Sequence, residues 1–366
     1  MIKKIIFRLF AVFTGLIFIF FILEIGLRIF NPQGTGAFKY AYDPELGCTP
    51  APYQRGRCVR PNYGFTNNSW GFRGAREYSK LKKVDLRILV LGDSYTYGMG
   101  VEDDQTFPAL LEKNLSLPGR SVEVINAGMP AKGTDYALKF LQTRAGKLNP
   151  DLVILCFDYT DFWDNQRNFY YTFHSDGSVS AKMPGKSLCA EKKTFIHSVF
   201  YNWLINWSHL ANLVRNSAAK IIIRQRQGLA KGNAAGLVID YPDKNNWVYK
   251  YDKELTVKFL DLLDDQTKKM GLELVIFYLG SHLDVIHYRE NGVVSDFERD
   301  FQVILKGRGI VNFSTTEEIA RSGLDIKDLY NIEAQDYHFS AKGNKIVADF
   351  MSHCLESIAL GQAVKN

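Results

Sequence analysis

A serine that follows the most strand-like run of the chain limits the fold more than any other feature. Leu86–Leu91 is apolar except for Arg87, and Gly92-Asp93-Ser94 ends this run before a glycine-containing turn and a helix-like segment. This order predicts a strand, a tight turn and a helix, which puts the hydroxyl of Ser94 at the carboxyl end of a strand. Open α/β sheets build their sites there. The three residues alone are weak evidence, because glycine, aspartate and serine are ordinary turn residues.

A second polar motif, far downstream, gives the first one weight. Asp336-Tyr337-His338 stands just before the last predicted helix. An early serine and a late Asp-x-His pair can supply a nucleophile, a base and a group that orients the base. The structural alternative makes Ser94 a helix-capping residue and Asp336 a neighbour of the helix cap Ser340. With both motifs in this order, the catalytic interpretation is favoured.

Apolar and helical segments alternate between these motifs. Strands are predicted at 86–91, 122–126, 151–157, 272–279 and 309–313, and helices at 107–115, 134–147, 253–270 and 341–358. Strands that alternate with helices predict a parallel sheet covered on both faces. The loops after the first three strands emerge at one edge of such a sheet, so they can line one crevice.

The N-terminal segment Ile5–Leu23 is almost continuously apolar. Its length suits a membrane-spanning helix better than the shorter apolar core of a signal peptide, which is the alternative. Basic residues precede it, which predicts a cytoplasmic N-terminus and a periplasmic or extracellular remainder. We predict a membrane anchor at 1–32, an irregular juxtamembrane segment at 33–85, and a catalytic domain at 86–366 with an insertion at about 165–250.

The net charge and the cysteines indicate which ligands and which cross-links the chain can have. The net charge of +6 is modest, and no dense Lys/Arg stripe interleaved with aromatic residues is present, so nucleic-acid binding is not supported. Cys48 and Cys58 bracket a short loop and could close a disulfide in an oxidising compartment. Cys156 lies in an apolar strand and is predicted to be a buried thiol. No Cys-x-x-Cys motif or histidine cluster indicates a metal site.

Four motifs together resemble the blocks of the SGNH/GDSL hydrolase superfamily. They are Gly92-Asp93-Ser94, Asn126-Ala127-Gly128, Tyr159-Thr160-Asp161 and Asp336-x-His338. The match runs from about residue 68 to the C-terminus, apart from the insertion. The resemblance implies a three-layer α/β/α domain of flavodoxin-like form, with no metal and no organic cofactor. It makes Ser94 the nucleophile and an oxyanion donor through its backbone N–H, His338 the base, and Asp336 the residue that orients the base.

Two positions depart from the family pattern. The slot of the second oxyanion donor falls on Ala131, although Gly128 is nearby, and Thr160 stands where the family has asparagine. Alanine keeps its backbone N–H, and a threonine hydroxyl can donate one hydrogen bond. Losing one oxyanion donor typically costs about 100- to 1,000-fold in rate. The departures therefore predict a slow or specialised enzyme.

The predicted function is a membrane-anchored serine esterase that removes O-acyl groups from a carbohydrate or lipid outside the cytoplasm. One alternative is an O-acyltransferase of an envelope polysaccharide. Another is a non-catalytic protein that binds glycan or an envelope protein partner on the same scaffold. Aromatic residues in and near the insertion form either a satellite core or a lid over the substrate; they are Trp163, Phe169, Tyr170, Tyr171, Phe173, Tyr201, Trp203 and Trp207.

Overall fold

The computed structural model divides the chain into two compact units. It describes residues 2–34, 38–59, 61–167, 170–174, 178–182, 199–215, 217–218, 247–334 and 336–360. The smaller unit is formed by Met1–Ala37, Gly56–Asn62 and Glu191–Val238, and the larger by Phe38–Arg55, Tyr63–Ala190 and Ile239–Asn366. The predicted boundaries at 32 and 85 stay predictions.

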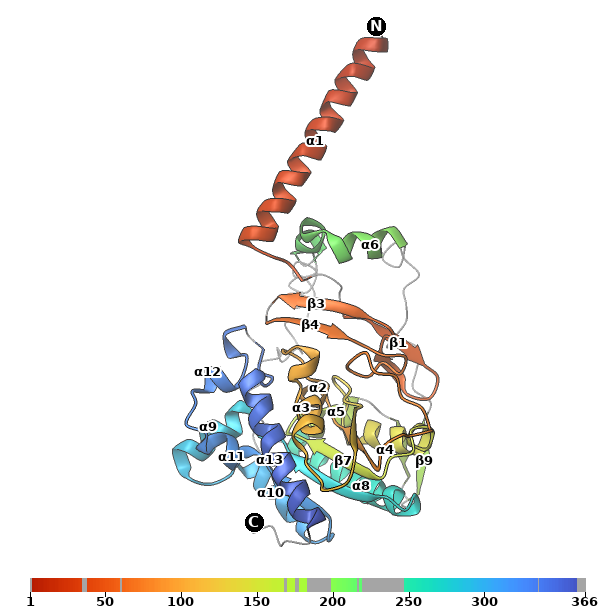
Figure 1. Cartoon of the computed structure of the whole chain (residues 1–366), viewed down its shortest axis with the longest axis vertical. Helices are drawn as coiled ribbons and strands as arrows, with labels where there is room; N and C mark the ends of the chain where they lie inside the picture. The colour runs from red at the N-terminus through yellow and green to blue at the C-terminus, as the bar shows by residue number, and fades with distance from the viewer. Residues whose placement is uncertain are drawn as a thin grey trace. The chain divides into compact units, whose positions relative to one another are not determined.

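Five parallel strands form the central sheet of the larger unit (Figure 1). They are β5 (Leu86–Leu91), β6 (Val122–Asn126), β7 (Leu152–Phe157), β10 (Glu273–Tyr278) and β11 (Val311–Ser314). Their order across the sheet is β6-β5-β7-β10-β11, and every neighbouring pair is parallel. This is the strand order of flavodoxin-like folds. The predicted fold class is confirmed, with all five predicted strands in place.

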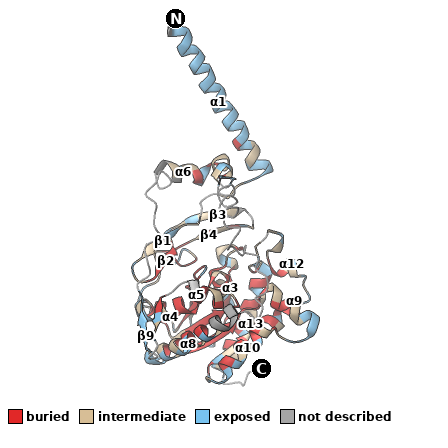
Figure 2. Cartoon of the chain, turned by 180° about the vertical axis from the view of Figure 1, so that it is seen from behind, coloured by how far each residue is buried: buried red, intermediate tan, exposed pale blue. Residues whose placement is uncertain are grey.

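Alternate side chains of each strand face two separate cores. In β5, Ile88 and Val90 belong to one core, whereas Leu89 and Leu91 belong to the other. The first core is covered by α3 (Phe107–Asn114), α9 (His282–Asn291), α11 (Thr316–Arg321), α12 (Ile326–Leu329) and α13 (Ala341–Ala359). The second is covered by α4 (Thr134–Thr143), α5 (Asp161–Arg167), α8 (Trp247–Lys269) and α10 (Asp296–Lys306). Figure 2 shows buried residues along α8 and α13, one helix from each layer. Burial on both faces explains why the strands are nearly continuous apolar runs.

The segment predicted to be irregular, 33–85, contains four short strands. β1 (Tyr40–Asp43) and β2 (Gly47–Pro50) pair antiparallel in the larger unit. β3 (Arg55–Val59) and β4 (Asn62–Thr66) form another two-stranded sheet, where the chain passes between the units. Most of their described side chains are partly buried or exposed, so they lack the apolar pattern by which strands are predicted.

The aromatic residues of the insertion do not act as one group. Tyr170 and Tyr171 are buried in the second core of the domain, where Tyr171 begins β8 (Tyr171–Phe173), which pairs with β9 (Val179–Ala181). These two residues therefore belong to the core of the domain and not to a separate satellite core. Trp203 and Trp207 are exposed in the smaller unit. Phe169 lies outside the described residues.

The smaller unit contains the N-terminal helix α1 (Ile2–Phe30), helix α6 (Val199–Trp207) and a further helical segment at 209–215. Lys3–Phe30 is long and apolar enough to cross a membrane, and its most apolar stretch is wholly exposed. Figure 2 shows this exposure along nearly all of α1. By length and composition, α1 fits the predicted anchor.

The cysteines partly contradict the prediction. Cys48 is disulfide-bonded, but Cys58 is not part of a disulfide. The predicted Cys48–Cys58 bond is therefore wrong, since closeness in sequence does not fix which cysteines meet. Cys156 is a buried thiol, as predicted, and burial raises the pKa of that thiol. Cys189 lies outside the described residues.

Candidate active site

Ser94 is the first residue of the short helix α2 (Ser94–Tyr97), directly after β5. The Asp93 carboxylate caps this helix by accepting a hydrogen bond from the backbone N–H of Tyr95. Gly92 has a φ of +156°, and a Cβ there would lie 2.2 Å from the Thr96 hydroxyl oxygen and 2.8 Å from a backbone oxygen of β7. Only glycine fits such a turn without displacement. The turn places the Ser94 side chain at the carboxyl edge of the sheet.

Three side chains from the two ends of the domain meet at this edge. The Ser94 Oγ lies 2.7 Å from Nε2 of His338. The other ring nitrogen of His338, Nδ1, lies 2.5 Å from Oδ1 of Asp336. That same oxygen accepts a hydrogen bond of 3.0 Å from the His338 backbone N–H. The structure therefore brings together the three residues that the two distant motifs predicted.

The loop that carries Asp336 and His338 is held to α2 by an aromatic residue. The Tyr95 hydroxyl donates a hydrogen bond of 2.9 Å to the backbone oxygen of Tyr337. The Tyr95 ring lies 5.0 Å from the His338 ring and 4.9 Å from the Phe339 ring, measured between ring centroids. Tyr95 is buried. The residue next to the serine thus fixes the ring of the histidine.

The pKa of Asp336 is below its ordinary value. Burial by itself raises this pKa, but hydrogen bonds from the His338 ring and backbone, with the charge of that ring, lower it overall. A lowered pKa keeps Asp336 ionised at neutral pH. An ionised carboxylate can hold the Nδ1 proton of His338 and stabilise the imidazolium that forms when Nε2 takes a proton.

Asp93 is a further functional candidate, although by residue type it is an ordinary turn residue. Its Oδ2 accepts a hydrogen bond of 3.2 Å from the Ser94 hydroxyl and one of 3.4 Å from the Thr160 hydroxyl. The same carboxylate oxygen of Asp93 therefore accepts hydrogen bonds from both hydroxyls. Asp93 gives Ser94 a second acceptor besides His338. In the sequence, the one indication of a role for Asp93 is its position next to Ser94 in the Gly92-Asp93-Ser94 motif.

Two more buried carboxyl groups, those of Asp158 and Asp161, are close enough to Asp93 to be affected by its charge. The pKa of Asp158 and that of Asp161 are raised well above the ordinary value by burial, and the charge of Asp93 raises both further. The Asp158 carboxylate accepts a hydrogen bond of 2.6 Å from the Thr160 backbone N–H. Asp161 accepts one of 3.0 Å from the Asp158 backbone N–H. Together they fix the loop that carries Thr160.

The loop after β6 approaches the turn that carries Gly92 and Ser94 closely. The Met129 N–H donates a hydrogen bond of 2.8 Å to the Gly92 backbone oxygen. A Cβ at Gly128 would lie 2.2 Å from the Tyr97 backbone nitrogen, so this position requires glycine. The Gly128 N–H already donates a hydrogen bond of 3.1 Å to the Asn126 side chain. Gly128 is thus placed to shape the loop.

Ala131 has a φ of +57°, in the left-handed region that favours glycine. Left-handed geometry costs an ordinary residue roughly 1–2 kcal/mol, against about 0.5–1 kcal/mol of extra backbone entropy for glycine. We expect Ala131→Gly to raise the free energy of unfolding by about 0.5–1 kcal/mol, measured by thermal unfolding of the full chain in detergent. Ala109→Gly, inside α3, is the matched control and should lower it by about 1 kcal/mol. A loss of stability in both variants would contradict strain at Ala131.

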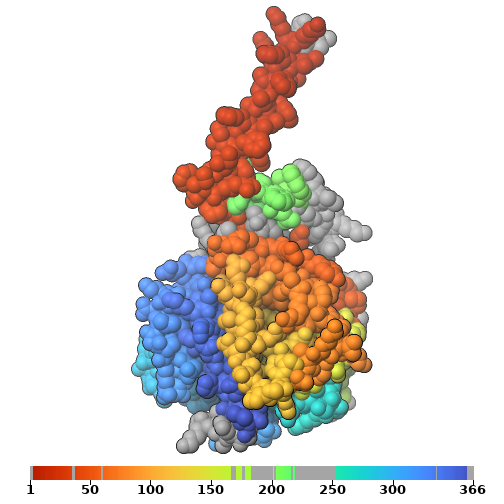
Figure 3. Space-filling model, in the orientation of Figure 1, coloured from red at the N-terminus to blue at the C-terminus, as the bar shows by residue number. Residues whose placement is uncertain are grey.

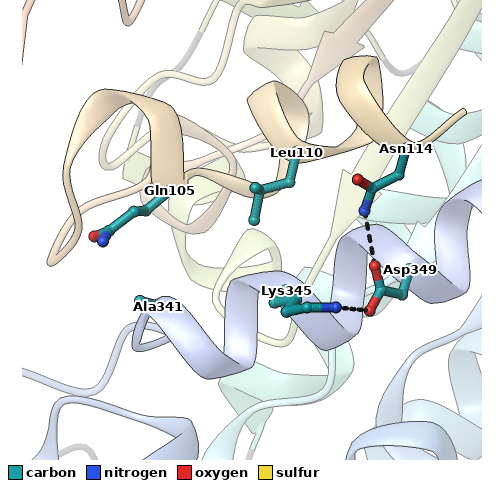
Figure 4. A pocket seen from close by; sticks show the side chains of 6 residues that line it. All are labelled: Gln105, Leu110, Asn114, Ala341, Lys345 and Asp349. Carbon is teal, nitrogen blue, oxygen red and sulfur yellow. Dashed lines mark hydrogen bonds and ion pairs between the residues drawn. The ribbon is translucent and has the colours of Figure 1, made fainter.

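A groove of about 260 Å³ lies between α3 and α13, away from these residues (Figure 4). The two helices lie side by side on the surface in Figure 3, α3 in yellow-orange and α13 in blue. The groove is lined by Gln105, Leu110, Asn114, Ala341, Lys345 and Asp349. The Asp349 carboxylate already accepts hydrogen bonds from Asn114 and Lys345. None of the predicted site residues lines this groove.

Comparisons with known proteins identify the family of the chain. The model of the GDSL-like lipase/acylhydrolase family matches residues 90–346, which is more than half of the chain. No curated protein sequence matches the chain.

Three solved esterase structures illustrate the similarity. A two-domain esterase active on acetylated mannans is 12% identical with a TM-score of 0.40, over 75% of this chain and only 50% of that protein. The acetyl xylan esterase AlAXEase is 14% identical with a TM-score of 0.39, over 74% of this chain and 100% of that one. The esterase EstA from Pseudoalteromonas sp. is 11% identical with a TM-score of 0.38, over 75% of this chain and 98% of that one. The assignment of the chain rests on the match to the family model.

Proposed function

The chain belongs to the GDSL-like lipase/acylhydrolase family, and we propose that it hydrolyses esters with Ser94 as nucleophile, His338 as base and Asp336 as the residue that orients the base. The observation that carries the proposal is the 2.7 Å contact between the Ser94 hydroxyl and His338 Nε2. A serine hydroxyl becomes a strong nucleophile only when a base within hydrogen-bond reach takes its proton.

The reaction would proceed in two halves. In the first, Ser94 Oγ attacks the ester carbonyl while His338 Nε2 takes the hydroxyl proton, and the same nitrogen then gives that proton to the leaving alcohol. In the second, water attacks the acyl-enzyme, His338 again takes and returns a proton, and the acid leaves. Asp336 keeps Nδ1 protonated, so that Nε2 is the basic nitrogen at each start.

The negative charge on the carbonyl oxygen needs donors. The Ser94 backbone N–H and the Ala131 N–H are the backbone candidates, and the Thr160 hydroxyl is the side-chain candidate. The Thr160 hydroxyl would have to turn from Asp93 Oδ2, 3.4 Å away, toward the substrate. Gly128 would have to release Asn126 before its N–H could take part. We therefore propose the Ser94 N–H as the first donor, with Ala131, Gly128 and Thr160 as the candidates for the others.

The proposed location rests on helix α1 and on the disulfide at Cys48. Helix α1 can cross a membrane by length and composition, and basic residues precede its apolar part. A disulfide at Cys48 suits an oxidising compartment. We propose that the catalytic unit faces the periplasm or cell exterior. Its substrates would be O-acyl groups on a carbohydrate or lipid.

Fluorophosphonate labelling tests the proposed nucleophile. The full chain in detergent is treated with a fluorophosphonate, and the labelled peptide is identified by mass spectrometry. We expect one label, on Ser94, and none on folded Ser94→Ala or His338→Ala protein. Label on another serine, or an unlabelled folded wild type, would exclude Ser94 as an activated nucleophile. Release of free acid from an acylated glycan then separates hydrolysis from transfer to a second hydroxyl.

A further inference from the structure

Helix α6 presents two large aromatic side chains to the outside of the smaller unit. Trp203 is 57% exposed and Trp207 is 65% exposed. They are four residues apart, so they lie on the same face of the helix. In the helical segment that follows, Val214 is 62% exposed. Tryptophan is enriched where membranes meet water, because its ring is apolar and its N–H is polar.

The segment after α6 is docked onto the end of α1 by a buried carboxylate. Glu24 is only 7% exposed. It accepts hydrogen bonds of 2.9 Å from the Ser208 hydroxyl, 2.9 Å from the His209 N–H and 3.0 Å from the Leu210 N–H. The last two are N–H groups at a helix start, which lack partners inside the helix and favour negative charge. Glu24 thus caps the segment at 209–215.

Two further contacts join the same elements. The Arg28 guanidinium donates a hydrogen bond of 2.6 Å to the backbone oxygen of Trp207 and one of 2.9 Å to Glu24. The Gln33 N–H donates one of 2.7 Å to Nδ1 of His209. The C-terminal end of α6 is therefore held at Glu24 and Arg28, and Figure 1 shows α6 running across the direction of α1.

The length of the apolar run in α1 sets where this junction lies. A helix rises 1.5 Å per residue, and roughly 20 apolar residues cross the hydrocarbon core of a bilayer. The run Ile5–Leu23 matches that length. Glu24, the next residue, then stands at the edge of the hydrocarbon. An ionised side chain there needs polar partners, and the segment at 209–215 supplies them.

We propose that the face of α6 carrying Trp203 and Trp207 lies in the headgroup region of the bilayer that α1 crosses. This rests on the proposed anchoring by α1. The occupant of the surface is phospholipid, because both tryptophans are exposed on a helix whose end is hydrogen-bonded to Arg28, at the interfacial end of the exposed apolar helix α1. Helices of this kind lie in the interface plane with aromatic and aliphatic side chains toward the acyl chains. The contact of α6 with the bilayer, in addition to the crossing by α1, would fix the orientation of both helices in the membrane.

Tryptophan fluorescence in lipid bilayers tests the proposal. The full chain is placed in phosphatidylcholine vesicles whose acyl chains carry bromine, a quencher, either near the headgroup or near the bilayer centre. The chain has 5 tryptophans. We expect stronger quenching by the shallow bromines, and loss of nearly all of it in Trp203→Phe/Trp207→Phe. Trp70→Phe is the matched control and should keep it, because Trp70 packs on Phe72 in the larger unit.

Different results distinguish a failure of anchoring by α1 from a failure of the lipid contact by α6. Extraction of the wild type from the vesicles by alkaline carbonate would overturn anchoring by α1. A retained protein with equal quenching in the wild type and the double variant would overturn the lipid contact alone and leave the surface to a protein partner. Glu24→Ala should stay anchored but lose at least half of the quenching. Unchanged quenching in Glu24→Ala would overturn the role of the docking contact.

Discussion

Ester hydrolysis by Ser94→Ala is expected to fall about a million-fold in kcat, the size of loss seen when the serine of such a triad is removed. The variant lacks the oxygen that lies 2.7 Å from His338 Nε2 and would attack the ester, so no acyl-enzyme can form on residue 94. Steady-state kinetics with an aryl acetate gives the rate. Thermal unfolding of the variant shows whether the fold is kept.

Ser79→Ala is the control for this substitution. Ser79 is exposed, and its hydroxyl donates only to the Leu81 backbone oxygen. Its kcat should equal that of the wild type. If folded Ser94→Ala keeps more than about a hundredth of the wild-type rate, far above the residual rate of a triad variant, the proposed mechanism is wrong.

Asp336→Asn is expected to lower kcat about ten-thousand-fold while the fold is retained. An amide at this position can turn its NH₂ group toward His338 Nδ1, which puts the proton on the wrong ring nitrogen. The lowered pKa of Asp336 adds a second measurement. A lowered pKa stabilises the fold above the ordinary aspartate value of about 3.9, and this contribution is lost as the pH falls through the lowered value. Stability of Asp336→Asn should depend less on pH in that range.

Asp349→Asn provides the comparison for the second substitution. Asp349 lies on α13 and pairs with Lys345 at the surface. Removing its charge should change neither kcat nor the pH dependence of the rate. Equal rates for Asp336→Asn and wild type would remove Asp336 from the proposed triad, whatever its distance from His338.

Both the parallel sheet and the closeness of Ser94 to the late Asp336-x-His338 motif could be predicted from the sequence, because both depend on buried parallel strands. Strands buried on both faces must be apolar along their whole length, so the five runs stand out from their surroundings. Parallel strands also share one carboxyl edge, and therefore Ser94 could be expected near the loop before α13. The short strands β1 to β4 carry no such pattern, because most of their described side chains are partly buried or exposed.

Other features depend on contacts that no local pattern encodes. Asp93 is an ordinary turn residue in the sequence, and its position under two hydroxyls follows from how β5 and β7 are packed. The bond of Cys48 is set by the folded chain and not by the nearness of Cys58. The departure at Ala131 was visible in the sequence, and its positive φ is the backbone geometry for which glycine is usually needed.

The placement of His338 and Asp336 on one short loop has a consequence for how the site can be switched. The two residues share a backbone turn closed by the His338 N–H, so a shift of the loop carries base and carboxylate together. The link from that pair to Ser94, the proposed nucleophile, is the hydrogen bond between His338 and Ser94, supported by the Tyr95 contact. Displacing the loop by a few ångströms would therefore break the contact between His338 and Ser94 but keep the contact between His338 and Asp336.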